Sequence, residues 1–190
     1  ARSDWNQYVN ANTNHELSNQ AVYEGATSLR VHDTEVTSPE ILGVSESDSP
    51  TEARVSTHLI NPTGTYQQRP CYFFRFQDAQ NYYVAVEENM SNLRLGRVEN
   101  GSYTEIDTAE GTNSVDSTTW HLQRMTAWED SSGDFRVRFE YDDGGTWAIL
   151  GSDLIDTAPV FESGGGVGIG GHTSAGFNNT IHFDATEVYY

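Results

Sequence analysis

Apolar and polar residues alternate in short runs along this chain, and this alternation restricts the fold more than any other feature. A period of two is the pattern of a β-strand that has one buried face. The runs are also rich in Val, Tyr, Phe, Thr and Trp, which favour strands. We therefore expect strands at residues 22–32, 53–61, 71–77, 82–88, 92–98, 102–107, 119–128, 135–141, 146–150, 166–171 and 180–190.

Turn-forming residues separate these runs. They stand at 78–81, 100–101, 131–133 and 142–145, and the Asn-Gly and Asp-Asp-Gly-Gly sequences among them are typical of tight hairpins. Short strands that follow one another closely, with almost no helical pattern, are typical of all-β proteins. The sequence therefore predicts an antiparallel sandwich or barrel.

The length of 190 residues fits one domain. No linker or repeat divides the chain, so we expect a single domain over 1–190, in which 1–21 forms an N-terminal strand or extension. Segments 33–51 and 108–118 have the Ser, Gly, Asn and acidic composition of loops. Cys71 has no second cysteine to pair with, and we expect it to be a small buried side chain of its strand.

The chain is strongly acidic, with 28 acidic and 10 basic residues and a net charge of −18. This balance argues against binding of a nucleic-acid backbone, which needs clustered positive charge, and against docking on anionic lipid. No run of apolar residues is long enough to cross a membrane as a helix. Partners are therefore sought among glycans and proteins.

All ten basic residues are arginine, and the chain has no lysine. Many carboxylates without lysine are the surface expected of a protein that works in molar salt. At about 1 M salt the Debye length is about 3 Å, so repulsion between carboxylates is screened. The composition thus predicts a halophilic protein.

Alternation within three of the expected strands places arginines opposite to apolar residues. In 135–141, for example, Phe135 and Val137 share one face while Arg136 and Arg138 share the other. We predict that four arginines lie on one outward face and bind an anionic ligand through their planar forks: Arg75, Arg94, Arg136 and Arg138. The alternative is that they pair with acidic residues of neighbouring strands, such as Glu87, Glu105 and Glu140.

Aromatic side chains offer stacking surfaces for sugars. Trp147 follows a Gly-rich turn, so among the four tryptophans it is the one we expect to be exposed and to bind a ligand.

The order of several segments resembles a known family. "YEGATSLRV", "YFFRFQDAQNYYVAVEENMSNLRLGRVENGSYTEI", "TTWHLQRMTAWED", "DFRVRFEYDDG" and the closing "GGVGIGGHTSAG…IHFDATEVYY" together look like a concanavalin A-like jelly roll of the laminin-G-like type. The resemblance runs from Val22 to the end of the chain. It implies a two-sheet jelly roll, similar to domains of surface proteins of salt-loving archaea and of virion proteins of their viruses.

The same resemblance implies a structural calcium ion between the early strand and the last one. Asp184 matches the carboxylate of the last strand, and Glu24 with the carbonyls of Gly25 and Ser28 matches the other side. Oxygen ligands of this mixed kind suit Ca²⁺. The alternative is that Asp184 caps backbone amides or faces solvent.

The family also contains glycoside hydrolases and lyases, so the fold alone does not decide whether the chain is an enzyme. Family-16 glucanases carry Glu-x-Asp-x-x-Glu on one strand. The nearest match here is Glu46, Asp48 and Glu52, with a spacing one residue too long and Pro50 in between. Motifs of jelly-roll lyases are absent from the sequence, and we therefore expect a non-catalytic protein.

These features predict a recognition or assembly module at a surface in high salt. In one setting it is a virion surface or tail protein of a haloarchaeal virus that contacts host glycans or other virion proteins. In the other it is a carbohydrate-binding or adhesion module of a secreted or wall-bound haloarchaeal protein. A polysaccharide hydrolase or lyase is the third interpretation, and self-association is compatible with each.

Overall fold

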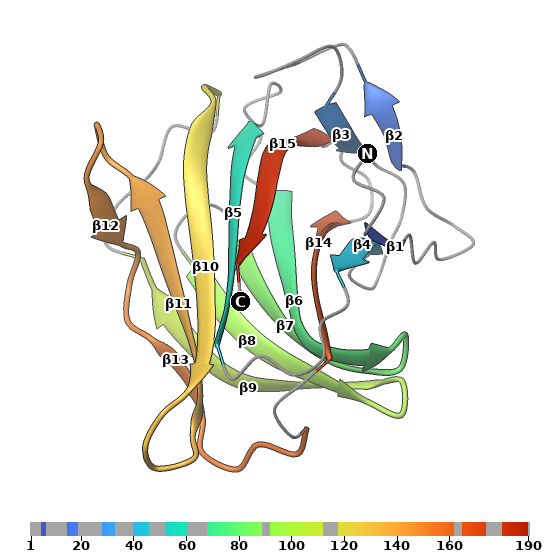
Figure 1. The fold of residues 1–190 in the computed structure, drawn as a ribbon, viewed down its shortest axis with the longest axis vertical. Helices are drawn as coiled ribbons and strands as arrows, with labels where there is room; N and C mark the ends of the chain where they lie inside the picture. The colour runs from blue at the N-terminus through green and yellow to red at the C-terminus, as the bar shows by residue number, and fades with distance from the viewer. Residues whose placement is uncertain are drawn as a thin grey trace.

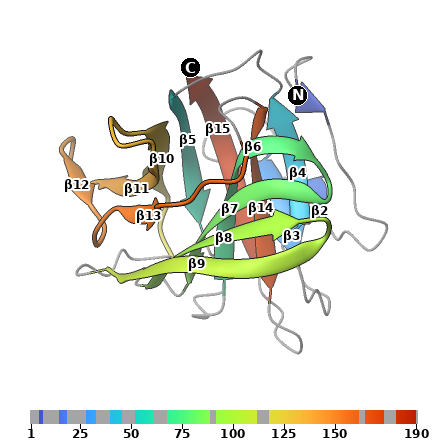
Figure 2. The same cartoon turned by 90° about the horizontal axis from the view of Figure 1, so that it is seen from below.

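The structure, a computed structural model, is a sandwich of two antiparallel β-sheets (Figures 1 and 2). It describes the backbone of residues 5–6, 15–18, 28–32, 40–45, 52–60, 68–88, 92–111, 118–161, 165–173 and 180–189. Side chains are described within 52–60, 69–88, 92–111, 118–161, 165–171 and 181–189. The all-β, two-sheet fold class that the sequence predicts is confirmed. No helix among the described residues has the length and apolar character needed to cross a membrane.

Sheet A has seven strands in the order β1-β4-β14-β6-β7-β8-β9. Their bounds are Trp5–Asn6 for β1, Glu40–Ser45 for β4, Gly166–Thr173 for β14, Gln68–Asp78 for β6, Asn81–Glu88 for β7, Asn92–Glu99 for β8 and Ser102–Glu110 for β9. The C-terminal strand β14 therefore lies between two strands from the first half of the chain, β4 and β6.

Sheet B has the order β12-β11-β10-β5-β15-β3-β2, and an eighth strand, β13, also pairs with β11. The bounds are Trp147–Ile149 for β12, Phe135–Asp142 for β11, His121–Glu129 for β10, Glu52–Ile60 for β5, Thr180–Tyr189 for β15, Ser28–His32 for β3, His15–Ser18 for β2 and Leu154–Asp156 for β13. The last strand, β15, lies between β5 and β3.

Strands extend into two segments that we expected to be loops. Strand β4 lies inside 33–51, and β9 runs on to Glu110 inside 108–118. Loop composition marks residues that tolerate turns, but backbone pairing with a neighbouring strand decides whether a segment is extended. Composition alone therefore gives too few strands here.

A hydrophobic core fills the space between the sheets. Sheet A supplies large side chains such as Tyr72, Phe74 and Leu95, and sheet B supplies others such as Met125 and Phe183, all of them buried. Burial of one such side chain contributes about 1.5–3 kcal/mol. The sequence left the orientation of 119–128 open, and the structure shows that every second residue of β10 from His121 to Ala127 faces inward.

Sheet A is also buried on its outer face, where β6, β7 and β8 run. A second apolar cluster lies there, formed by Cys71, Phe73, Phe76, Tyr82, Val84, Val86 and Val98. We call this set the outer cluster. Strand β7 is therefore buried on both faces, which alternation alone does not predict. Burial of Cys71 raises the pKa of its thiol, in line with the small buried side chain expected for it.

A β-bulge in β6 explains how Phe76 reaches the outer cluster. Arg75 has a positive φ of 46°, and the pairing of β6 with β7 shifts between Phe74 and Asp78. A bulge reverses the alternation of side chains beyond it. Phe76 consequently joins Phe73 on the outer face, and Arg75 turns inward. Figure 1 shows β6 and β7 bending before their hairpin.

Candidate carbohydrate-binding face

An ion-pair network crosses four neighbouring strands on the outer face of sheet A. Its members are Arg69 of β6, Glu88 of β7, Arg94 of β8 and Glu105 of β9. The strand register explains why Arg94 and Glu88 are close. Val86 of the outer cluster pairs with Arg94, and Glu88 lies two residues after Val86, so all three are on the outer face. We call these four residues the sheet A network.

Arg94 is the centre of the network. Its Nε donates to Oε2 of Glu88 at 2.7 Å, and its Nη1 donates to Oε2 of Glu105 at 2.7 Å. Glu88 also pairs with Arg69. Partial burial lowers the pKa of the Arg94 guanidinium, but Glu88 and Glu105 outweigh it, and the net shift is upward. Two cations and two anions thus form a neutral cluster of planar groups, of which Arg94 is 43% exposed.

Tyr103 of β9 lies beside this network, with its phenol end over the backbone of Gly96. A Cβ at Gly96 would come 2.6 Å from the Tyr103 hydroxyl oxygen and 2.7 Å from its Cζ, so the absence of a side chain at Gly96 allows the ring to lie there. The side chain is nevertheless 49% exposed. Its partial burial, and then the Glu105 carboxylate, raise the pKa of Tyr103. An exposed aromatic ring therefore stands next to planar donors and acceptors.

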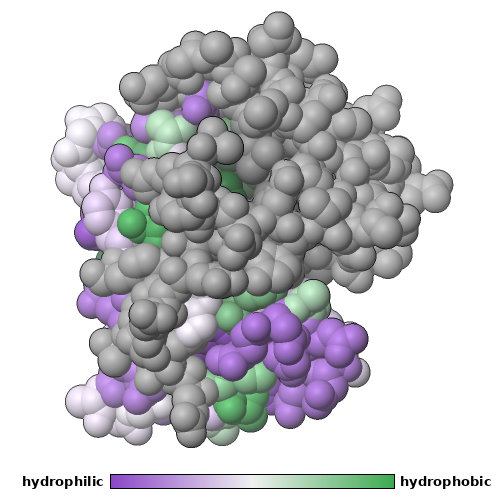
Figure 3. All heavy atoms as spheres, turned by 45° about the vertical axis from the view of Figure 1, so that its right-hand side comes forward, coloured by the Kyte–Doolittle hydropathy of each residue, from purple (hydrophilic) through white to green (hydrophobic). Residues whose placement is uncertain are grey.

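The Tyr103 ring and the sheet A network lie at the border between the buried outer cluster and the exposed surface of sheet A. Apolar residues of β6 and β7 are buried on this face, whereas Arg94, Tyr103 and Glu105 reach solvent. Figure 3 shows a separate group of hydrophilic residues low on the described surface, at the height of the β6–β7 and β8–β9 hairpins in Figure 1. An apolar ring with hydrogen-bonding groups at its edge is the arrangement that binds sugars, because sugars have both apolar faces and hydroxyl groups.

The structure does not bring the four predicted arginines together on one face, so that part of the prediction is wrong. Arg94 lies on sheet A, whereas Arg136 and Arg138 lie on β11 of sheet B. Arg136 pairs with Asp130, and Arg138 donates from Nε and Nη2 to the two carboxylate oxygens of Asp153 at 2.7 and 2.9 Å. Long-range strand pairing, which local alternation does not encode, separates them.

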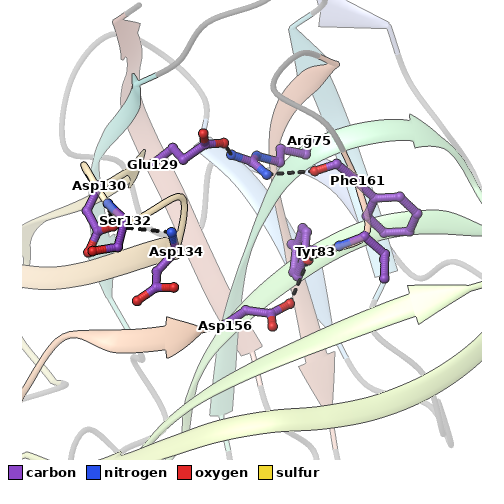
Figure 4. Close-up of polar contacts among 9 residues, drawn as sticks. Arg75, Tyr83, Glu129, Asp130, Ser132, Asp134, Asp156 and Phe161 are labelled. Carbon is purple, nitrogen blue, oxygen red and sulfur yellow. Dashed lines mark hydrogen bonds and ion pairs between the residues drawn. The ribbon is translucent and has the colours of Figure 1, made fainter. Parts of the chain in front are cut away.

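Arg75 is directed into the sandwich and is 7% exposed. Its Nη1 donates to the carbonyl of Phe161 at 2.6 Å, and its Nη2 donates to Glu129 of β10 at 2.8 Å (Figure 4). Its guanidinium also lies over the ring of Phe135, 4.6 Å from the centroid. Arg75 thus joins the two sheets. All four arginines pair with carboxylates of this protein, and Arg94 does so with the neighbouring strands, as the alternative expects. No observation tests ligand binding by any of the four, so that role remains a prediction.

Trp147 lies on the edge strand β12 of sheet B and is half-buried. The guanidinium of Arg124 covers its ring at 4.0 Å from the centroid, and Arg124 itself pairs with Glu140. The ring is therefore partly occupied by the protein's own side chain. Ligand binding at Trp147 remains untested.

The predicted calcium ligands fall largely outside the described residues. Nothing is described of Glu24 and Gly25, and only the strand backbone is described at Ser28, the first residue of β3. Asp184 is half-buried, and its Oδ1 accepts a hydrogen bond from the backbone N–H of Ala185 at 2.8 Å. Among the residues with described side chains, no three His, Cys, Asp or Glu gather as a metal site would require. The calcium site therefore remains a prediction. Glu46 and Asp48 also lie outside the described residues, and Glu52 is the exposed first residue of β5.

Tyr103 is not among the site residues predicted from the sequence. A glycine in the middle of an expected strand marks a close approach of another group, and Gly96 is such a glycine. Its partner could not be named without the register that places Gly96 opposite Glu105 and near Tyr103. The position of Gly96 within its strand was thus the one signal in the sequence that pointed to a group lying close to β8.

Comparison with known proteins gives the fold a wider context. No protein-family model matches the sequence, and no curated protein is similar to it in sequence. Among solved structures, the carbohydrate-binding module CBM66 from Bacillus subtilis matches with a TM-score of 0.62 and 16% identity over 98% of this chain and 96% of that chain. The exoplasmic/lumenal domain of VIP36, in a Ca²⁺/Man3GlcNAc-bound form, matches with a TM-score of 0.56 and 10% identity over 87% of this chain and 79% of that chain.

An engineered GH43 glycoside hydrolase with endo-xylanase and exo-arabinofuranosidase activity also matches, with a TM-score of 0.55 and 13% identity. The match covers 89% of this chain but 36% of the enzyme, so this chain corresponds to about a third of it. Identities this low show the fold alone. The fold is a sandwich of two antiparallel sheets that matches concanavalin A-like lectin structures, in agreement with the fold that the sequence resemblance implies.

Proposed function

We propose that this protein is a non-catalytic glycan-binding module whose binding face comprises Tyr103 and the sheet A network. The observation that carries the proposal is the exposed Tyr103 ring next to Arg94, whose guanidinium is held by two carboxylates. The likeness to a carbohydrate-binding module over almost the whole of both chains supports it. This reading favours the second of the two settings predicted from the sequence, a carbohydrate-binding module, over a virion protein.

The charge balance of the network selects the kind of sugar. Arg69 and Arg94 are paired with Glu88 and Glu105, so these four residues together offer donors and acceptors without net charge. Sugar hydroxyls both donate and accept, and they fit such a mixed set of planar groups. The ligand of this face is therefore a neutral glycan, which differs from the anionic ligand that four unpaired arginines would favour.

The test is binding of Tyr103→Ala to neutral glycans, measured on a glycan array and then by calorimetry. We expect an affinity loss of at least tenfold, about 1.4 kcal/mol. Ile149→Ala is the matched control, because Ile149 is a similarly exposed large side chain on sheet B. Equal binding by Tyr103→Ala and the unmodified protein would contradict the proposal. Release of reducing sugar from a bound polysaccharide would show an enzyme instead.

The working environment is a second part of the proposal. We infer a high-salt setting from the net charge of −18 and the absence of lysine. At 0.01 M salt the Debye length grows to about 30 Å, so carboxylate repulsion acts across the whole surface. The melting temperature should fall when KCl is lowered from 3 M to 0.05 M. A constant or rising melting temperature would contradict the halophilic assignment.

Calcium belongs to the proposal as well, at the four positions that the family resemblance implies. Asp184 and Ser28 each stand one residue beyond the last pair between β15 and β3, which is Phe183 with Leu29. An ion that binds only the folded state raises its stability, by about 2.7 kcal/mol at one hundred times the Kd. A chelator at fixed salt should lower the melting temperature, and Asp184→Ala should remove that response. No response in the unmodified protein would exclude the site.

A further inference from the structure

Three arginines on the outer face of sheet B each lie over an aromatic ring. The guanidinium carbon is 4.0 Å from the ring centroid for Arg124 and Trp147, 4.8 Å for Arg54 and Tyr189, and 5.2 Å for Arg138 and Trp128. Such stacking holds a guanidinium by its flat face and leaves the N–H groups at its edge available. The outer face of sheet B therefore carries oriented arginine forks.

Arg54 differs from the other arginines in its charge balance. Seven of the eight arginines with described side chains have a carboxylate within 4.0 Å, namely Arg69, Arg75, Arg94, Arg97, Arg124, Arg136 and Arg138. Within the part of the chain that the structure describes, Arg54 has its contact with the Tyr189 ring and no such carboxylate. An uncompensated cation is therefore held in place on a strongly acidic protein.

The register shows which groups surround Arg54. It pairs with Tyr189 of β15 on one side and with Thr126 of β10 on the other, and Thr126 pairs in turn with Arg138 of β11. A hydroxyl thus stands on the strand between two arginines. Arg138 binds Asp153 through Nε and Nη2, so its Nη1 is not used in that pair.

Two carboxylates stand near Arg54 on this face, Glu187 of β15 and Glu52 of its own strand β5. Glu187 accepts a hydrogen bond from the hydroxyl of Tyr189, two residues along β15. Glu52 is exposed and pairs in register with Trp128 rather than with Thr126. Neither lies within ion-pair distance of Arg54 among the described contacts. The positive charge of Arg54 is therefore available to a ligand.

We propose that Arg54, Thr126 and Arg138 form a binding site for an oxyanion, a carboxylate or sulfate group, on the outer face of sheet B. The Arg54 fork binds two oxygens of the anion, the Thr126 hydroxyl donates to one of them, and Nη1 of Arg138, which Asp153 leaves unused, donates a further hydrogen bond. Charged forks of this kind bind carboxylate and sulfate bidentately. The site lies on the opposite sheet from Tyr103, so its test is independent of the test of the neutral-glycan proposal.

The experiment is calorimetric titration at constant ionic strength with sodium sulfate and, separately, with an oligogalacturonate. The unmodified protein should bind sulfate saturably, and Arg54→Gln should weaken binding at least tenfold. Arg124→Gln is the matched control, because Arg124 is stacked on a ring of the same face but neutralised by Glu140. It should bind as the unmodified protein does. Thr126→Val should weaken binding several-fold, and Arg54→Lys should give an intermediate loss, since it keeps the charge and loses the fork.

The two ligands distinguish the source of the anion. Oligogalacturonate binding that depends on Arg54 assigns the site to acidic polysaccharides, whereas sulfate binding alone assigns it to free oxyanions. Absence of saturable binding to both would overturn the proposal. It would also be overturned if Arg124→Gln lost as much affinity as Arg54→Gln, because the effect would then be general charge. Melting curves of each variant establish that it is folded before it is titrated.

Discussion

The outer faces of the two sheets are built in different ways on the same shared core. Over β6 and β7 the outer face of sheet A is apolar and buried, with Phe73 and Val84 in the outer cluster. In β10 and β11 of sheet B, buried residues of the inner face alternate with half-buried residues of the outer face. This outer face carries arginines, tryptophans and acidic residues. One sheet is thus covered on both sides, and the other presents a polar surface.

This difference shows which sequence pattern accompanies burial of a strand on both faces. Strand β7, with the sequence NYYVAVEE, has apolar residues at consecutive positions and is buried throughout its length after Asn81. Strand β11 has the alternating sequence FRVRFEYD, and its buried and half-exposed positions alternate from Phe135 to Glu140. Continuous apolar runs are typical of strands covered on both faces. The residues at the alternate positions of a strand therefore predict whether its sheet packs on one side or on both: apolar residues there indicate burial of both faces.

The largest expected effect comes from the outer cluster. Phe73→Ala should lower the free energy of unfolding by about 3–5 kcal/mol, because it removes a fully buried ring that contacts Tyr82. Thr126→Ala, on the outer face of sheet B, should cost less than about 1 kcal/mol. Urea denaturation measures both. Similar small losses for the two variants would show that sheet A has no second core.

A buried carboxyl between the sheets should make stability depend on pH. Glu87 of β7 accepts a hydrogen bond from Gln123 of β10 at 2.8 Å, and Gln123 accepts one from Tyr72 at 3.1 Å. Oε1 of Glu87 has no hydrogen-bond partner among the described residues. Burial raises the pKa of Glu87 to about 7, although the bond from Gln123 acts in the opposite direction.

The folded state therefore holds a proton on Glu87 that the unfolded state releases near pH 4.5. Between about pH 4.5 and 7 the folded state binds more protons, so stability falls as the pH rises through this window, by on the order of 3 kcal/mol, and levels off above it. Glu87→Gln should remove this part of the dependence, and Glu99→Gln, at an exposed position, should retain it. Unfolding curves from pH 4 to 9 provide the measurement. An unchanged profile in Glu87→Gln would mean that Glu87 is ionised in the fold.

Arg75 tests the connection between the sheets. Arg75→Lys should cost about 2–3 kcal/mol, because the single ammonium cannot reach both the Phe161 carbonyl and Glu129, and one acceptor loses its donor. The loss should appear in the melting temperature and leave glycan binding unchanged. A variant as stable as the unmodified protein would show that the bulge, rather than the arginine, sets this part of β6.

The smallest expected effect is on the polar face of sheet B. Arg138→Lys loses the paired hydrogen bonds to Asp153 and the stack on Trp128, but Arg138 is partly exposed. We expect a loss of about 1 kcal/mol or less, as measured for exposed ion pairs. Thermal unfolding in low and high salt provides the measurement, and the difference from the unmodified protein should shrink as salt increases. A loss as large as that of Arg75→Lys would make this face structural rather than available for ligands.

Part of the candidate site could be read from the sequence. Alternation around Arg94 correctly placed it opposite Leu93 and Leu95, which are buried in the core. Glu105 was among the acids expected to pair with strand arginines, and it does pair with Arg94. Tyr103 was missed, because its position over Gly96 depends on a register shift between β8 and β9 that follows Leu95. Local patterns give the face of a residue but not its neighbour across the sheet.

The sequence by itself determined most of the described strands, the turns between them and the inner faces of the strictly alternating ones, because alternation and turn-forming residues act over a few neighbouring positions. Tertiary structure alone decided which strands share a sheet, and it thereby separated Arg94 from Arg136 and Arg138. It also decided the direction of Arg75, since a positive φ at a non-glycine residue is imposed by contacts with Phe161, Glu129 and Phe135 rather than favoured locally. Contacts between residues far apart in the chain carry this information, and no local pattern contains it.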